Sequence, residues 1–239
     1  MQVLRDNVHK IFHKVDNLFL YALENKLKYI SYLHLSIDDV HDCFEKLHKD
    51  KISIWQEDFF NILRDLHVKY GAKFTLFCLE DSSASIPKEN IGELAACADW
   101  LSLAWHGSYR AGNKVKSFIN FMERYKNTGI YLGSVLRLHN FEADKELVGI
   151  LKQYGISGLL CADDKRNSYG RTYKEYSSGK DSFYRQTDMR LENFISSRLL
   201  LTNRNTLYIF AHEMPFMKYK EYEKLDTFLQ LTRESKFII

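Results

Sequence analysis

The sequence lacks the features that mark a membrane, secreted or multidomain protein. It has only two prolines in 239 residues and no Ser/Gly-rich linker or run of one charge sign. No segment approaches the roughly 20 apolar residues that cross a bilayer. The amino terminus has no continuous apolar stretch before a small-residue cleavage site. We therefore expect a cytoplasmic protein of one domain, residues 1–239, that begins with an amphipathic helical segment at 1–27.

The net charge is small, and motifs for paired cysteines or nucleotide binding are absent. The 34 basic and 31 acidic residues leave a formal net charge of +3, which is too small and too evenly spread for a nucleic-acid partner. The four cysteines have no CxxC spacing, which favours free thiols in a reducing compartment over disulfides or a Cys-ligated metal. No GxxxxGK[ST], GxGxxG or GxSxG motif is present, so a nucleotide-driven enzyme or a serine hydrolase is not expected.

Six apolar runs stand out because each ends in a side chain capable of chemistry. Their lengths and their β-branched and aromatic residues predict strands, and the intervening stretches are long enough for helices, which predicts a parallel α/β sheet. Active sites of such folds lie at the carboxyl ends of the strands. The residues at the ends of the runs are Asp38 and Asp39, Glu80 and Asp81, His106, Arg137 and His139, Asp163 and Asp164, and His212 and Glu213.

Between the runs, apolar residues recur at helical spacing, and several of these helices end at a glycine, such as Gly71 or Gly155. The alternation of predicted strands and helices stops at residues 164–190, a polar, tyrosine-rich stretch that is expected to form a long loop. The segment FYRQTDMRLEN within and after it has the character of an added strand or hairpin. The chain is expected to close with a helix and a final strand.

Asp38 and Asp39 are adjacent in LSIDDV, at the end of the first run. A turn there would bring both into one pocket, with one carboxylate on a metal ion and the other acting as a base. The alternative is that the pair caps the following helix.

Histidines at the other ends fit the same chemistry. His106, in WHG, supplies an imidazole typical of zinc sites beside a glycine that permits close backbone approach. Arg137 and His139 are two residues apart and are expected on one face of a strand, with Arg137 holding Asp38 ionised. His212 is a candidate general acid. Each assignment has a structural alternative. His106 could pack against Trp105, Arg137 could form a structural salt bridge, and His212 could be a core histidine bonded to the backbone.

The order SIDD, WHG, RLH, AD and IFAHE resembles the polysaccharide deacetylase superfamily, the NodB-homology carbohydrate esterases, over residues 29–216. Within it, the chain is most similar to a divergent SIDDV-type branch associated with surface-polysaccharide gene clusters. The resemblance implies a distorted, TIM-like (β/α) barrel with about seven parallel strands. It also implies a metal-dependent hydrolase that removes an N-acyl group, such as acetyl, from an amino sugar of a glycan or glycan precursor.

The resemblance assigns roles to residues. It casts Asp38 as base, Asp39 and His106 as ligands of a divalent ion (zinc, with cobalt or nickel as alternatives), Arg137 as the partner of the base and His212 as acid. The family's second metal histidine is replaced here by Arg110, and a guanidinium cannot bind a cation. Either another group, foremost His139, completes the site, or the protein binds metal weakly or not at all.

The partner expected is a carbohydrate, and no feature specifies an oligomeric state. Six residues are expected to contact the substrate, with Asp163 or Asp164 also resembling the carboxylate that supports His212. Two other functions stay open: a non-catalytic carbohydrate-binding relative that has lost the metal, and a glycosidase using a carboxylate pair such as Asp38 and Asp163. The expected substrate contacts are Trp105, Tyr109, Arg110, Asp163, Asp164 and Glu213.

Overall fold

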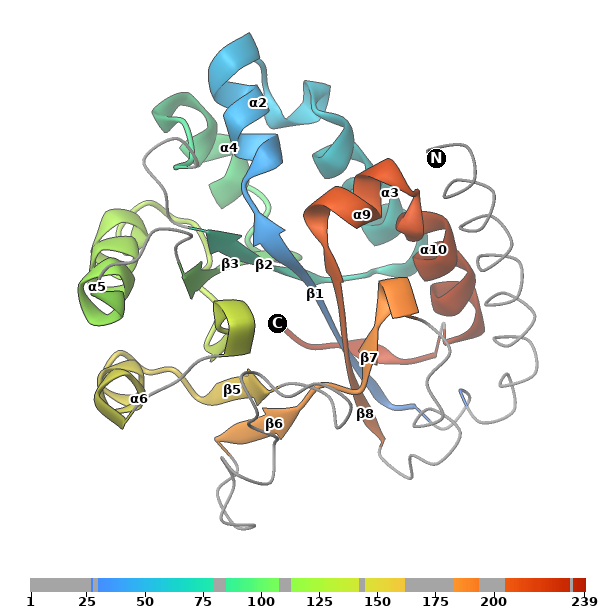
Figure 1. Ribbon diagram of the computed structural model, residues 1–239. Coiled ribbons are helices and arrows are strands. Elements are labelled where there is room, and N and C mark those ends of the chain that lie inside the picture. The colour runs from blue at the N-terminus through green and yellow to red at the C-terminus, as the bar shows by residue number, and fades with distance from the viewer. Residues whose placement is uncertain are drawn as a thin grey trace, which may run out of the picture.

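In a computed structural model of the protein, short strands alternate with helices (Figure 1). The structure describes residues 27, 30–79, 85–107, 113–141, 145–161, 183–193, 205–232 and 234–239. The described strands are β1 (Tyr32–Val40), β2 (Phe74–Leu79), β3 (Leu101–Gly107), β4 (Val135–Leu136), β5 (Gly158–Cys161), β6 (Tyr184–Gln186), β7 (Met189–Arg190), β8 (Thr206–His212) and β9 (Lys236–Phe237). The described α-helices are α2 (Asp42–Asp50), α3 (Asp58–Tyr70), α4 (Ile91–Ala95), α5 (Lys114–Tyr125), α6 (Lys145–Gln153), α9 (Glu213–Lys218) and α10 (Glu221–Leu231).

The strands form two sheets, and every strand pairing described is parallel. The larger sheet has the order β3-β2-β1-β8-β7, with β9 pairing to the start of β1, and the smaller has the order β4-β5-β6. All six apolar runs contain a strand, and FYRQTDMRLEN contributes β6 and β7. The expectation of an α/β fold built on parallel strands is therefore confirmed.

A continuously hydrogen-bonded barrel, however, is not formed by the described residues. On one side, β3 meets the segment before β4 through a single bridge between Leu103 and Leu132. On the other, the chain bends from β6 in the smaller sheet to β7 in the larger, with the Thr187 amide donating to Cys161 and the Asp188 amide to Tyr208. β4 is only two residues long, and β6 and β7 belong to different sheets, so the strand ladders are interrupted at both places. The expected barrel is instead two sheets joined by one bridge and one bend of the chain.

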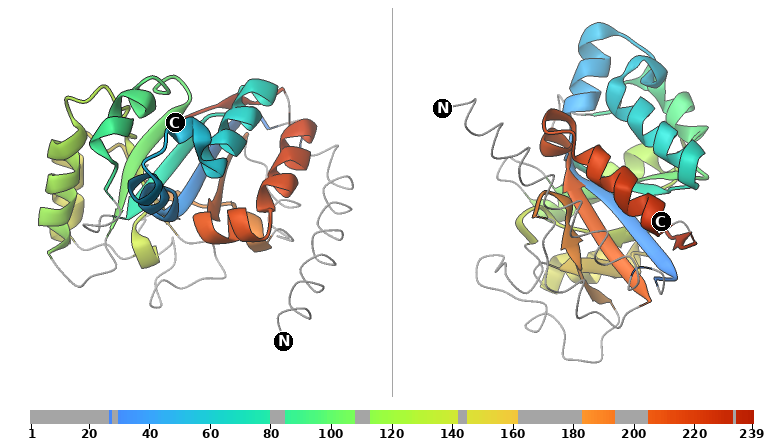
Figure 2. Two further views of the ribbon diagram at one scale, coloured as in Figure 1. Left: turned by 90° about the horizontal axis from the view of Figure 1, so that it is seen from above. Right: turned by 90° about the vertical axis from the view of Figure 1, so that its right-hand side faces the viewer.

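Helices surround the strands, with α5 and α6 on one side and α3, α9 and α10 on the opposite side (Figures 1 and 2). This cover buries both faces of β1, the central strand of the larger sheet, from Leu33 to Asp38. Alternation along a strand puts Leu33, Leu35 and Ile37 on one face. The other face carries His34, Ser36 and Asp38, all nearly inaccessible to solvent. A polar interior thus runs along β1 toward its carboxyl end.

Parallel pairing brings the carboxyl ends of the strands to one edge of the fold. Asp38 of β1 is paired in register with His212 of β8, and His106 lies at the end of β3. Of the residues that the sequence singled out, Asp38, Asp39, His106 and His212 therefore converge at this edge. Among the described residues, no helix has both the length and the apolar character needed to cross a membrane.

Candidate active site

The backbone at the end of β1 turns so that two adjacent carboxylates reach one site. Asp39 has a φ of 56°, in the left-handed region that costs a non-glycine residue roughly 1–2 kcal/mol. The pairing of β1 with β2 is irregular at the same point, between Ile37 and Val40. On a regular strand, neighbouring side chains would point to opposite faces. The turn at Asp39 removes this alternation, as the sequence analysis anticipated for Asp38 and Asp39.

Three imidazoles surround the carboxylate of Asp39. Nε2 of His106 lies 3.2 Å from Oδ1 of Asp39, and Nε2 of His139 lies 3.9 Å from the same oxygen. Nε2 of His212 lies 3.9 Å from Oδ2. Burial raises the pKa of Asp39, but the nearby His106, together with His212 and His139, outweighs this effect, so the net pKa lies below its ordinary value. Asp39 is thus held as an anion at the centre of the cluster.

This donor set fits a divalent metal ion. Ligand atoms about 2.1 Å from a tetrahedral zinc ion lie about 3.4 Å from one another. The separation of 3.2 Å between His106 and Asp39 is close to this value, and the separations of 3.9 Å from Asp39 to His139 and His212 are longer. Oδ1 of Asp39 is buried and accepts no well-directed hydrogen bond from the described residues, although His106 is near. A buried carboxylate oxygen without such a donor, facing imidazole nitrogens, is the arrangement expected where an ion would bind.

The orientation of His106 supports this interpretation. Its Nδ1 donates to the carbonyl oxygen of Arg137 over 2.6 Å, and the ring is buried. A donating Nδ1 leaves the lone pair on Nε2, the atom that faces Asp39. The hydrogen bond therefore fixes both the ring and the tautomer that a metal ligand requires.

His139 reaches the site from a different element than expected. The strand β4 ends at Leu136, and His139 begins a 3-10 turn, η3 (His139–Phe141), so Arg137 and His139 do not share a strand face. The neighbouring glycine makes room for it: Gly107 has a φ of 131°, and a Cβ there would lie 3.3 Å from Cβ of His139. The close approach expected at the WHG glycine is present, and His139 is what approaches.

Asp38 forms a buried ion pair with Arg137. Nη1 of Arg137 donates to Oδ1 of Asp38 over 2.7 Å and to Ser36, and Nη2 donates to Thr187. The guanidinium is fully buried and lies over the ring of Phe210, with 4.2 Å between Cζ and the ring centroid. Burial lowers the pKa of Arg137, and the charge of Asp38 opposes that change. The contact between Arg137 and Asp38 expected from the sequence is thus present.

His212 is held by a carboxylate that the sequence analysis missed. Oε1 of Glu192, on the turn η4 (Leu191–Asn193), accepts from both the backbone N–H and Nδ1 of His212, each over 2.8 Å. Oε2 of Glu192 accepts from Nε of Arg190 over 2.9 Å. Burial raises the pKa of Glu192, but His212 and Arg190 outweigh it, so the net pKa is lowered. Nε2 of His212 is consequently directed at Asp39.

The signal for Glu192 was present in the sequence but weak. Glu192 lies two residues after the end of β7 at Arg190, so it follows the pattern of polar residues just beyond strand ends. β7 is only two residues long and contains no apolar run, so the end of this strand is not marked in the sequence. Of the expected site residues, Tyr109, Arg110, Asp163 and Asp164 lie outside the described residues, as do Glu80, Asp81 and most of the 164–190 segment.

Two other expected substrate contacts are buried. Trp105 is 1 % exposed, packs edge-on against Phe118 and donates from its indole N–H to Ser117 of α5. Glu213 is 2 % exposed, and both carboxylate oxygens accept hydrogen bonds from the amino end of α2. The structure therefore places Trp105 against α5 and Glu213 against α2.

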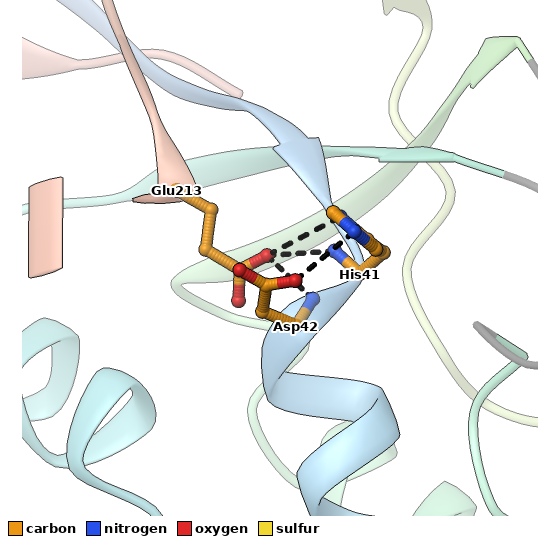
Figure 3. Close-up of side chains that lie close together, drawn as sticks. All are labelled: His41, Asp42 and Glu213. Carbon is orange, nitrogen blue, oxygen red and sulfur yellow. Dashed lines mark hydrogen bonds and ion pairs between the residues drawn. The ribbon is translucent and has the colours of Figure 1, made fainter. Parts of the chain in front are cut away.

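Glu213 belongs to a second cluster, with His41 and Asp42, whose potential ligand atoms lie within 4.8 Å of one another (Figure 3). The potential ligand atoms of Glu213 and His41 are already engaged by hydrogen-bond partners. Glu213 accepts from three backbone N–H groups, those of His41, Asp42 and Cys43. Nδ1 of His41 lies 2.8 Å from the Asp39 carbonyl and Nε2 lies 3.0 Å from Asp42, so both ring nitrogens face acceptors. This donor set suits a carboxylate bound at a helix end better than a metal ion.

Comparisons with known proteins agree with the fold. No protein-family model matches the sequence, and no curated protein matches it. The peptidoglycan N-acetylglucosamine deacetylase Bc1960 has 12% identity and a TM-score of 0.51, over 87% of this chain and 85% of that one. A family 4 acetyl xylan esterase from Clostridium thermocellum, in complex with a cobalt ion, has 12% identity and a TM-score of 0.50 over 87% of each chain.

A 4-alpha-glucanotransferase from Thermococcus litoralis has 15% identity and a TM-score of 0.57, over 87% of this chain and 39% of the other. Such low identities establish a shared fold alone. The resemblance to polysaccharide deacetylases seen in the sequence is therefore confirmed as a likeness of fold. Because the same fold occurs in a glucanotransferase, the choice between functions has to come from the site.

Proposed function

We propose that this protein is a metal-dependent hydrolase that removes an N-acyl group, such as acetyl, from an amino sugar in a glycan or glycan precursor. The observation that carries the proposal is the convergence of three imidazoles on Asp39, next to a second carboxylate, Asp38, at one edge of a parallel α/β fold. Similar folds occur in a peptidoglycan deacetylase and an acetyl xylan esterase, which supports this class of substrate.

Asp39, His106 and His139 would hold the ion, zinc or alternatively cobalt or nickel. His139 would take the place of the family's second histidine, whose position is occupied here by Arg110. When bound, a divalent ion supplies Lewis-acid polarisation of a carbonyl group and activation of a water molecule. The lowered pKa of Asp39 keeps this carboxylate ionised, as a metal ligand must be.

Asp38 and His212 would transfer protons, and Arg137 and Glu192 would hold these two side chains in place. Asp38 would take a proton from the attacking water, and Arg137 fixes its carboxylate through the 2.7 Å ion pair. His212 would donate a proton to the sugar nitrogen as the bond to the acyl carbon breaks. Glu192 accepts from Nδ1 of His212, so the transferable proton is on Nε2 and the charged imidazole is stabilised.

Cleavage of a glycosidic bond is an alternative function, suggested by the similar fold of the glucanotransferase. A glycosidase needs two carboxyl groups on either side of the scissile bond. Here Asp38 is tied to Arg137, and Asp39 is surrounded by imidazoles, which favours metal chemistry over a carboxylate pair. A non-catalytic carbohydrate-binding protein is the other rival, and it would not require the paired Glu192 and His212.

We also place the protein in the cytoplasm, in a role in glycan biosynthesis. All four cysteines are free and buried, which suits a reducing compartment.

The test is metal analysis of the purified protein after supplying zinc, cobalt and nickel, together with acetate release from N-acetylglucosamine oligosaccharides. We expect one ion per chain and metal-dependent acetate release. Asp38→Asn should retain the ion and lose hydrolysis, whereas Asp39→Asn should lose both. Absence of any stoichiometric ion would overturn the proposal. Sugar binding without acetate release would identify a binding protein, and new reducing ends without acetate would identify a glycosidase.

A further inference from the structure

Asp39 adopts a backbone conformation that needs support from the rest of the structure. Its φ of 56° is unfavourable for a residue with a Cβ, yet this conformation is what lets Asp38 and Asp39 face the same site. Such a conformation persists only where neighbouring contacts hold it. The residues immediately after Asp39 therefore decide whether the metal-binding carboxylate stays in place.

Those residues are held by one side chain, that of Glu213. Oε2 of Glu213 accepts from the backbone N–H groups of His41 and Asp42 over 2.7 and 2.8 Å (Figure 3). Oε1 of Glu213 accepts from the backbone N–H of Cys43 over 2.7 Å. These three donors form the first turn of α2, where helical backbone N–H groups have no partner within the helix. No side chain of α2's own N-cap residue, His41, supplies such a bond.

A second contact carries the restraint back to Asp39. The ring of His41, whose backbone is bound by Glu213, donates from Nδ1 to the carbonyl oxygen of Asp39 over 2.8 Å. Glu213 in turn is fixed by its place in the chain, directly after His212, which pairs in register with Asp38 across β8 and β1. Glu213 is 2 % exposed, so water does not compete effectively for its hydrogen bonds.

We infer that Glu213 is a positioning residue for the metal centre: by binding the backbone of residues 41–43, it locks the left-handed turn that aims Asp39 at His106 and His139. It does not touch the substrate or the ion. It couples the end of the strand that carries the metal-binding carboxylate to the end of the strand that carries the acid, His212. The inference builds on the proposed function in that it takes Asp39 as a metal ligand.

The test compares Glu213→Gln with Glu57→Gln. The amide keeps the shape of the side chain but replaces one accepting oxygen by an NH₂ group, which cannot accept. Glu57 is a matched control because it too is a buried glutamate that accepts from the amino end of a helix, through the N–H groups of Phe59 and Phe60 of α3. It lies at a helix that does not follow a site strand.

Two readouts separate positioning from simple helix stabilisation. Isothermal titration of the metal-free proteins with Zn²⁺ should show affinity at least 10-fold weaker for Glu213→Gln and unchanged for Glu57→Gln, although both variants lose thermal stability. Crystal structures of the metal-free proteins should show a changed φ at Asp39 and a longer distance from Asp39 to His106 in the Glu213 variant only. Should Glu213→Gln fail to fold, Glu213→Asp keeps the charge, and its shorter side chain cannot reach all three donors.

The outcomes distinguish the inference from the proposed function. If the wild-type protein binds no metal, the proposed function fails, while the φ of Asp39 in the variant still decides the role of Glu213. If the variant retains a φ near that of the wild type and the same zinc affinity, the positioning role is overturned. Equal losses of affinity in Glu57→Gln and Glu213→Gln would likewise show that only general stability is at stake.

Discussion

Nε2 of His139 lies 3.9 Å from Oδ1 of Asp39, the oxygen that His106 also approaches. His139 comes from a 3-10 turn beyond the short strand β4, not from the segment that carries His106. Under the proposed function, it stands where a further imidazole is needed, because Arg110 occupies the position of the family's second metal histidine.

His139→Ala should weaken zinc binding by more than the roughly 10- to 100-fold that changes in residues behind metal ligands cause, because it removes a ligand itself. Isothermal titration with Zn²⁺ measures the change. His48→Ala is the control, since the His48 ring bonds the carbonyl oxygen of Ser85, away from the site. Unchanged zinc affinity in His139→Ala would exclude His139 as a ligand.

Gly107→Ala should both destabilise the protein and disturb His139. The φ of 131° is unfavourable for alanine, and the added Cβ would press on Cβ of His139. We expect a loss of unfolding free energy of about 1–3 kcal/mol and weaker zinc binding. The control is Gly149→Ala, where a Cβ meets nothing within 4 Å in helix α6 and should be neutral or stabilising. If Gly107→Ala bound zinc as the wild type does, the proposed need for close approach would be wrong.

Glu192→Gln should lower kcat for acetate release by about 10- to 100-fold, because Nδ1 of His212 loses its anionic partner. Zinc affinity should stay near that of the wild type, since Glu192 contacts His212 and Arg190 and none of the three proposed metal ligands Asp39, His106 and His139. Exposed Glu223→Gln serves as a control with the same change in charge. A variant with wild-type kcat would show that Glu192 does not support proton transfer.

His34 should make the protein sensitive to acid. It is buried between the rings of Phe77 and Tyr208, and burial, together with the charges of Arg137 and Arg185, lowers its pKa to about 3. Below pH 6.5 the unfolded chain takes up a proton that the folded protein does not accept until about pH 3. Folding stability is therefore lost as the pH falls through this range, by about 2 kcal/mol between pH 7 and pH 5 from this group.

Urea denaturation at pH 7 and pH 5 measures this effect. His34→Leu removes the titrating group and should show a smaller loss of stability between the two pH values than the wild type. The difference between the two proteins isolates His34 from the other histidines. Identical losses would show that His34 is not the acid-sensitive group.

Much of the fold could be predicted because it depends on local patterns. Apolar runs such as those around Leu35 and Leu76 specify strands, and the periodic stretch before Gly71 specifies α3, which ends there with a φ of 68°. The predicted distorted barrel is not closed by the described residues, and this could not be predicted, because strand closure depends on pairing between distant segments. The two-residue β4 and the bend between β6 and β7 leave no clear trace in the sequence.

Some residues of the candidate site could likewise be predicted from the sequence, and others could not. Asp38, Asp39, His106 and His212 were identifiable because parallel strands place their carboxyl ends together, a consequence of fold class alone. Glu192 and the bonds of Glu213 were not identifiable, since which carboxylate meets which histidine or helix depends on contacts between residues far apart in the chain.

The sequence by itself determined the parallel α/β class and the polar residues at the ends of the strands. Only the tertiary structure decided that His139 faces Asp39, that Glu192 holds His212, and that Asp39 turns into the left-handed region. The physical reason is the distance along the chain over which each kind of interaction acts. Hydrophobic periodicity and turn residues act within a few positions of the chain, whereas ligand geometry is set by packing between elements that the chain brings together only on folding.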